Sequence, residues 1–399
     1  MPPTFPAEIV HEFMLRVNED RERIDTLLSC SLVSQIWCAL ARPYLYTQVV
    51  LNVEHGRVQK ATAFTSTLTK FPHFRTYIHR LLLVVPYTPS DSSVSVMAAL
   101  GDLASLQSLR IRPIVVYDMA DDDKLQKHLP PLLSSKSLTF LELSDIQHFQ
   151  IDLLRLCSSL QTLALRRVEY SLTPTSGAES ETTGYWAEGW PALKSLILST
   201  EEDGQSKMLS VFRSPRSPVD LSQLETFIGL DQCDTTKAYQ DHCKFISHVS
   251  RTLKTVHIDP PSSYLREGVQ APHLPLELHK LQSISNMTLS IVQQPHRQRN
   301  ALPWLISVLS GLPDPGTLRN LTLLCDLEDH SGNDFTFHAQ GWSELDALLP
   351  RFHHLRRVHL KCYDERDAKA ATELVSWLHS QLPILVNKGL LSVEHFSGM

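Results

Sequence analysis

The stretch Leu106-Gln107-Ser108-Leu109-Arg110-Ile111 carries the pattern that decides the fold of this chain. It places apolar side chains at its first, fourth and sixth positions. The alternation of its second half puts Leu109 and Ile111 on one face of a short β-strand, because side chains along a strand point to opposite faces in turn. Leu160-Gln161-Thr162-Leu163 is nearly the same phrase and lies further along the chain. The phrase is therefore a candidate repeat.

The same apolar spacing returns along the rest of the chain. Its instances are Ile78/Leu81/Leu83, Leu106/Leu109/Ile111, Leu138/Leu141/Leu143, Leu160/Leu163/Leu165, Leu193/Leu196/Leu198, Leu224/Phe227, Leu253/Val256/Ile258, Leu281/Ile284, Leu318/Leu321/Leu323, Leu355/Val358/Leu360 and Leu390/Val393. Helix-like segments separate them at 95–103, 124–133, 238–250 and 342–349, and a last helix is expected within 365–382. The pattern predicts an α/β solenoid with parallel strands on the concave side and helices on the convex side.

Residues 4–46 read as three short helices that precede the repeats. Their apolar positions recur at helical spacing and are Ile9, Phe13 and Val17, then Ile24, Leu27, Leu28 and Leu32, then Val33, Trp37, Leu40 and Ala41. Pro43 is expected to end the third helix. A unit this small buries little surface alone, so we expect it to dock on another surface. A helical cap on the following domain is one alternative. A DNA-binding helix-turn-helix is disfavoured by four basic against six acidic residues here.

Several fragments in this stretch stand in the order and spacing of a known motif. They are Phe5-Pro6-Ala7-Glu8-Ile9, Cys30-Ser31-Leu32-Val33-Ser34, Trp37, and Leu40-Ala41-Arg42-Pro43-Tyr44-Leu45-Tyr46. Together they resemble the F-box motif, with Phe5 in place of its usual leucine. The repeats resemble the divergent leucine-rich solenoids found behind many F-boxes, as in F-box proteins of the fungal type. The resemblance implies an F-box over residues 1–46 and an irregular leucine-rich-repeat-like solenoid over 47–399, with insertions near 171–190, 199–220 and 259–277.

F-boxes bind a Skp-family adaptor that bridges to a cullin, so the resemblance implies the substrate-receptor subunit of a ubiquitin ligase. By position in the motif, the expected adaptor-binding residues are Pro6, Ile9, Leu28, Val33 and Trp37. Packing within the helical unit is the alternative role of Trp37. In this interpretation the chain has no catalytic residue, and an unknown protein substrate binds to the solenoid.

The substrate is expected on the concave face. The strand residues pointing there include Arg110, Arg112, Arg166, His257, His359 and Lys361. The three arginines lie on neighbouring repeats and could form a small basic patch for an acidic or phosphorylated segment. The alternative is that they only keep the strand face soluble.

Composition narrows the function further. The chain has 399 residues and a net charge of −6, which argues against nucleic acid as the main partner. Seven scattered cysteines without a Cys-x-x-Cys pair indicate a reducing compartment, the cytoplasm or the nucleus. No signal segment and no apolar run long enough to cross a membrane is visible.

No motif for catalysis, a cofactor or a metal is visible. His11-Glu12 lacks the second histidine of a zinc-protease helix, because position 15 is leucine. Two other hypotheses remain open. One is an adaptor-bound interaction scaffold without ubiquitination activity, and the other is an enzyme built on a doubly wound α/β sheet.

Overall fold

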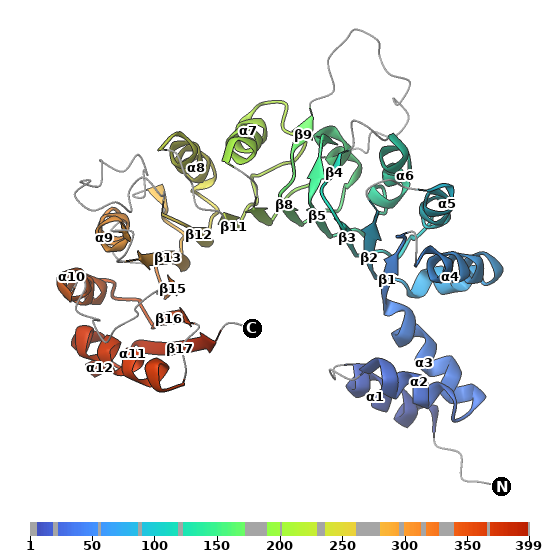
Figure 1. Ribbon diagram of the computed structural model, residues 1–399, viewed down its shortest axis with the longest axis horizontal. Helices are drawn as coiled ribbons and strands as arrows, with labels where there is room; N and C mark the ends of the chain where they lie inside the picture. The colour runs from blue at the N-terminus through green and yellow to red at the C-terminus, as the bar shows by residue number, and fades with distance from the viewer. Residues whose placement is uncertain are drawn as a thin grey trace. The chain divides into compact units, whose positions relative to one another are not determined.

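The computed structural model divides the chain into two compact units, Met1–Pro191 and Ala192–Met399. Each unit is a row of strand–helix repeats (Figure 1). The structure describes residues 6–18, 23–54, 57–86, 90–118, 123–171, 190–199, 202–229, 236–260, 280–294, 299–312, 317–326, 339–364 and 368–397.

The first unit begins with three helices, α1 (Ala7–Asn18), α2 (Arg23–Ser31) and α3 (Gln35–Thr47). Their shared core consists of Val10, Met14, Leu27, Cys30 and Ala41. The Ser34 side chain caps α3 by accepting the N–H of Trp37 at 3.3 Å. Three helices were predicted in this part of the chain, and three are present.

The prediction that Pro43 ends the third helix is wrong, because α3 continues to Thr47. Proline removes one backbone donor, but that loss is tolerable when the helix is held by tertiary packing. Tyr44 and Leu45, just after the proline, pack against the core of the three helices. The Thr47 hydroxyl also donates to the Pro43 carbonyl at 2.7 Å.

Five parallel strands follow in the first unit, and each lies beside the next. They are β1 (Gln48–Asn52), β2 (Arg80–Val85), β3 (Ser108–Pro113), β5 (Phe140–Ser144) and β8 (Thr162–Arg166). The connecting helices are α4 (Val58–Lys70), α5 (Asp91–Ala99), α6 (Asp123–Leu133) and the 3₁₀ segments η1 (Pro72–Tyr77) and η2 (Ile151–Leu156). Short accessory strands are β4 (Tyr117–Asp118), β6 (Ile146–Gln147), β7 (Phe149–Gln150) and β9 (Tyr170–Ser171).

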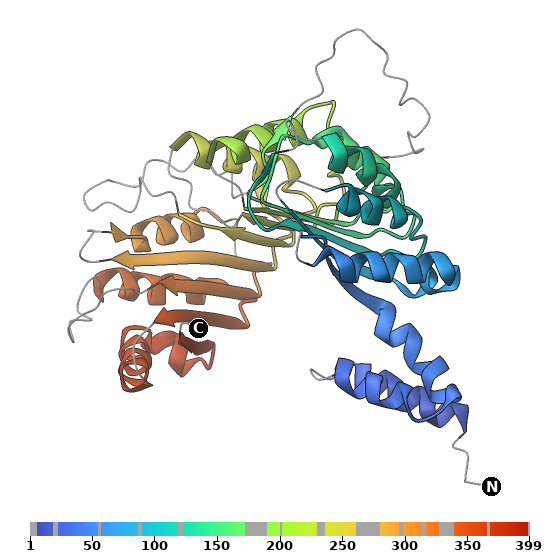
Figure 2. The same ribbon diagram turned by 45° about the vertical axis from the view of Figure 1, so that its right-hand side comes forward.

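The second unit repeats this scheme (Figure 2). Its parallel strands are β10 (Ser195–Ser199), β11 (Thr226–Gly229), β12 (Thr255–Ile258), β13 (Asn286–Gln294), β15 (Asn320–Asp326), β16 (Arg357–Asp364) and β17 (Leu391–Ser397). The antiparallel β14 (Arg299–Asn300) pairs with β13. Its helices are α7 (Glu202–Arg213), α8 (Thr236–Val249), α9 (Leu302–Ser310), α10 (Ala339–Leu348), α11 (Ala368–Gln381) and α12 (Pro383–Asn387), with the 3₁₀ segment η7 (Leu349–Arg351).

Alternation along each strand separates a core face from an open face. In β15, Leu321 and Leu323 are fully buried, whereas Thr322 between them is half-buried. The leucines align in register with those of the neighbouring strand, for example Leu323 with Leu360 of β16. The helices cover the core face in each unit (Figure 1). We call the other side of the strands the open face.

The structure confirms the predicted order of parallel strands and helices, and it resembles a leucine-rich-repeat solenoid in that respect. The repeat assigned to Leu281/Ile284 is three residues out of register: β13 buries Met287 and Leu289, with Ile284 before them. Methionine in place of leucine hid the true spacing. The helices α4 and α9 and the strand β1 were not predicted.

The insertion predicted near 199–220 is wrong, because α7 occupies Glu202–Arg213. The Glu-Glu-Asp-Gly opening of that segment looked like a loop, but the apolar side chains of Met208, Leu209 and Phe212 are buried and hold the helix on the sheet. The predicted insertions near 171–190 and 259–277 fall almost entirely outside the described residues. No described helix has the length and apolar character needed to cross a membrane.

Candidate functional site

The three-helix unit exposes more large apolar side chains for its length than the rest of the described chain. Among the described residues, sixteen large apolar side chains are exposed, and eight of them lie between Ile9 and Ile36. Leu32 is 87% exposed and Val33 is 64% exposed, and both lie in the turn between α2 and α3. Apolar surface gathered in this way is characteristic of an interaction site.

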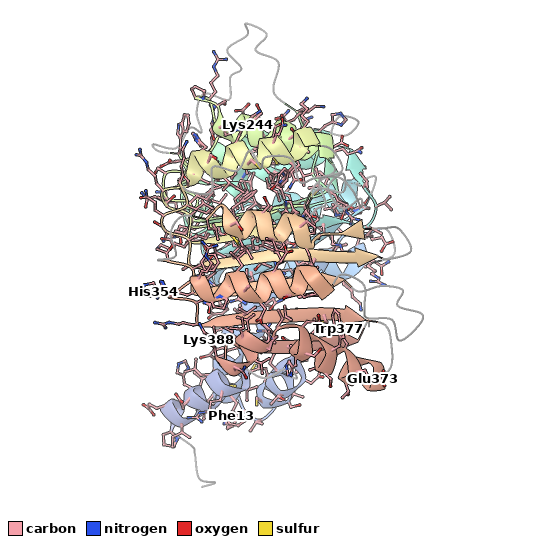
Figure 3. The ribbon with its side chains drawn as sticks, turned by 90° about the vertical axis from the view of Figure 1, so that its left-hand side faces the viewer. Phe13, Lys244, His354, Glu373, Trp377 and Lys388 are labelled. Carbon is pink, nitrogen blue, oxygen red and sulfur yellow. The ribbon has the colours of Figure 1, made fainter. Side chains whose placement is uncertain are left out.

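Six of these side chains form what we call the apolar patch. Its members are Ile9, Phe13, Leu28, Leu32, Val33 and Ile36. Phe13 of α1 contacts α3, because the centroid of its ring lies 5.7 Å from the ring centroid of Trp37. Leu28 lies in the last turn of α2, just before the turn that holds Leu32 and Val33. Figure 3 labels Phe13 on the three-helix unit.

The patch exists because α1 carries two apolar stripes. Val10, Met14 and Val17 face the shared core. Ile9 and Phe13 lie about 85° around the helix from that stripe and stay exposed, which follows from 3.6 residues per turn. The predicted stripe of Ile9, Phe13 and Val17 is therefore divided between the surface and the core.

The five predicted adaptor-binding residues all lie in this unit. Pro6 directly precedes α1, and its carbonyl accepts the N–H groups of Ile9 and Val10 at 3.1 and 3.2 Å. Ile9, Leu28 and Val33 belong to the apolar patch. Trp37 is half-buried, packs against the core and touches Phe13, so it combines a packing role with a place at the edge of the patch.

Three patch residues were not among the predicted binding residues: Phe13, Leu32 and Ile36. Phe13 and Leu32 were assigned to helical stripes without a side being chosen. Ile36 lies in the first turn of α3, beyond the turn that holds Leu32 and Val33, so no helical spacing in the sequence links it to the other patch residues.

On the open face of the first unit, Glu142 joins two of the predicted arginines. Its Oε2 lies 3.3 Å from Nε of Arg110, and its Oε1 lies 3.1 Å from Nε of Arg166. The Arg110 guanidinium also lies over the Phe140 ring, 5.2 Å from its centroid. Arg112 is exposed and stands outside this network. The structure therefore brings Arg110 and Arg166 together and leaves Arg112 separate.

In the second unit, His257 and His359 occupy the same row of the open face but are three strands apart, on β12 and β16. His257 Nε2 lies 3.1 Å from Asp259 Oδ1, and the Ser290 hydroxyl also donates to that carboxylate. The carboxylate stands between the serine and the imidazole, so the order is not that of a Ser–His–Asp triad.

His359 Nε2 lies 3.0 Å from Glu394 Oε2. Lys361 follows His359 on the same face and is opposite Glu394 in register. Burial lowers the pKa of His359, and the charges of Arg357 and Lys361 lower it further, although Glu394 acts in the opposite direction. The imidazole is thereby held neutral, so the charges on this part of the open face are those of Arg357, Lys361 and Glu394.

Possible metal ligands and cysteine thiols are the remaining reactive groups. No group of three or more His, Cys, Asp or Glu side chains within the described ranges is arranged to hold a metal ion. Six cysteines in those ranges are free thiols, and burial raises the pKa of the Cys157 thiol to about 12. Such a thiol is almost entirely protonated near neutral pH and is a poor nucleophile.

Comparison with known proteins adds little. No protein-family model matches the chain, and no curated protein matches it. Among solved structures, an internalin from Listeria monocytogenes is similar over 82% of this chain and 79% of its own, with 13% identity and a TM-score of 0.35. A similarity that low carries no argument. The repeating strand–helix fold itself suggests a protein-interaction scaffold.

Proposed function

We propose that this chain is the substrate-receptor subunit of a Skp–cullin–F-box ubiquitin ligase. The three-helix unit would bind a Skp-family adaptor through the apolar patch, and the open faces of the sheets would hold the target protein. The observation that carries the proposal is the apolar patch itself, on a helical unit whose own core is made by other residues. Three of the six patch residues, Ile9, Leu32 and Val33, lie within the F-box-like fragments of the sequence.

Apolar side chains exposed to water gain free energy when a partner covers them. Each large apolar side chain removed from water stabilises a complex by about 1.5–3 kcal/mol if it becomes fully buried. Leu32 is 87% exposed and Val33 is 64% exposed, so most of that gain remains available to a partner. The core of the three-helix unit need not rearrange when a partner buries the patch, which keeps the entropic cost of binding low.

In this proposal the chain makes and breaks no bond. It raises the local concentration of the target beside a ubiquitin-charged enzyme and orients it. A second candidate is an adaptor-bound scaffold that recruits no cullin. A complex of chain and adaptor that captures a cullin would favour the receptor, and a complex that binds the adaptor but no cullin would favour the scaffold.

The test is the affinity of the full chain for a purified Skp-family adaptor, measured by calorimetry. The Leu32→Asp, Val33→Asp double variant should weaken binding by more than about 2 kcal/mol, roughly thirtyfold, as expected for anchors at the centre of an interface. Both side chains lie in a turn and outside the core, so the variant should remain folded.

Leu15→Asp is the matched control, because Leu15 is exposed on α1 but on the flank away from Ile9 and Phe13. It should bind the adaptor as the wild type does. Failure of a folded wild-type chain to bind, or equal weakening by both changes, would contradict the proposal.

A further inference from the structure

We propose that the open face of the first unit is a binding site for an extended protein segment rich in aspartate and glutamate. The inference rests on the proposed role of the sheet in holding a target protein. It does not depend on the adaptor. The arginines of this face would bind the acidic side chains of the target segment.

The open face of the first unit is positively charged. The five strands present fifteen side chains on it, three from each strand, including Arg80, Arg110, Arg112 and Arg166. Glu142 is the only acidic residue among the fifteen, so the face carries a net charge of +3. The whole chain carries −6. A concentrated positive face on an acidic protein attracts an anionic partner.

The arrangement of the arginines favours carboxylates spread along a chain. Arg110 and Arg112 lie about 6.6 Å apart along β3, at about 3.3 Å per residue. Arg166 is two strands further on from Arg112, about 9.6 Å across the sheet. Arg80 stands at the other end of the neighbouring strand. A row of carboxylates fits charges that are distributed in this way better than one phosphate group does.

Apolar side chains border the arginines. Val50 and Leu82 lie in the same row as Arg110, and Val84 lies beside Arg112. Val50 is exposed, and the two others are half-buried. An extended ligand faces the sheet with every second side chain, so a ligand whose facing side chains are both acidic and apolar has a partner for each kind on this face.

Glu142 already shows how a carboxylate is bound here. Its two oxygens receive Arg110 and Arg166 at 3.3 and 3.1 Å, and its side chain is only 19% exposed. Glu142 thus competes with a ligand for two of the four guanidinium groups. Arg80 and Arg112 have no such competitor on the face, so they are the first contacts for an incoming carboxylate.

The test uses fluorescence anisotropy with a labelled peptide of three Asp-Leu-Glu-Ser repeats and the full chain. Binding should weaken at least tenfold in the Arg80→Glu, Arg112→Glu variant. It should strengthen about threefold or more in Glu142→Gln, which frees two arginines. If Glu142 only held the fold together, its replacement would not raise the affinity for the peptide. Lys60→Glu, Lys70→Glu, at two exposed positions of α4, is the control with the same change in charge and should stay within twofold of the wild type.

Two further peptides separate the sources of negative charge. One replaces every acidic residue by its amide, and the other is that neutral peptide with one phosphoserine. The proposal is overturned if the acidic peptide fails to bind, if the neutral peptide binds equally, or if only the phosphopeptide binds. Adaptor binding is measured on the same preparation. A chain that binds the adaptor but no acidic peptide refutes the acidic-segment inference and leaves the adaptor-binding proposal standing.

Discussion

Asp346 on α10 should hold the end of the second unit together. Its carboxylate is buried and accepts two backbone hydrogen bonds, with Oδ2 receiving the Ile384 N–H at 2.9 Å and Oδ1 the Leu385 N–H at 3.0 Å. Those N–H groups belong to the first turn of α12, where backbone donors lack helical partners. One charged side chain therefore fixes a helix of five residues.

Replacement of Asp346 by alanine would remove both bonds and leave two donors unpaired. A hydrogen bond to a charged group contributes about 1.5–3 kcal/mol. Allowing for partial hydration of the opened turn, we expect Asp346→Ala to lower the free energy of local opening by about 3 kcal/mol, which corresponds to roughly a hundredfold.

Amide hydrogen exchange measures this opening directly, because parts of a protein open with their own free energies. The amides of Ile384 and Leu385 should exchange about a hundredfold faster in Asp346→Ala. Glu344→Ala is the control, since Glu344 is an exposed carboxylate on the same helix, and it should change their exchange less than threefold. Unchanged protection in Asp346→Ala, or equal loss in both variants, would refute the reasoning.

Three other predictions follow from single contacts. Ser34→Ala removes the cap on the Trp37 N–H and should lower the stability of the three-helix unit by about 1 kcal/mol, measured by urea denaturation. Cys157, whose pKa is raised to about 12 by burial, should resist alkylation by iodoacetamide at pH 8 until the chain is unfolded, as peptide mass analysis would reveal. The pKa of His359 is lowered in the fold, so the unfolded chain binds more protons; its contribution to stability should be present above about pH 6.5 and lost as the pH falls, and the ring should titrate below that value by NMR.

Much of the fold could be predicted because every repeat must bury the same alternating apolar positions of its strand. Leu321 and Leu323 must both be buried, so a slip of one residue would expose the whole row. Where a repeat departs from leucine the prediction weakened, as in β13, where Met287 fills the leucine position. Helix α7 was missed because its polar opening residues outweighed the later apolar positions.

The candidate sites were predictable in part. Motif spacing brought Ile9, Leu28 and Val33 into the expected binding set, but it could not tell which of the two stripes of α1 faces the core. That choice depends on the packing of three helices together. The link from Arg110 through Glu142 to Arg166 likewise arises between strands that are distant in the sequence and needs the register of the sheet. Arg80 was overlooked because it precedes the apolar pair of its repeat.

The most direct test of the proposed adaptor-binding role is the hydrogen-exchange footprint of a purified Skp-family adaptor on the full chain. The account predicts slower exchange over residues 7–14 and 28–37, with the repeats in 58–171 unchanged. No binding, or protection confined to the repeats, would contradict it.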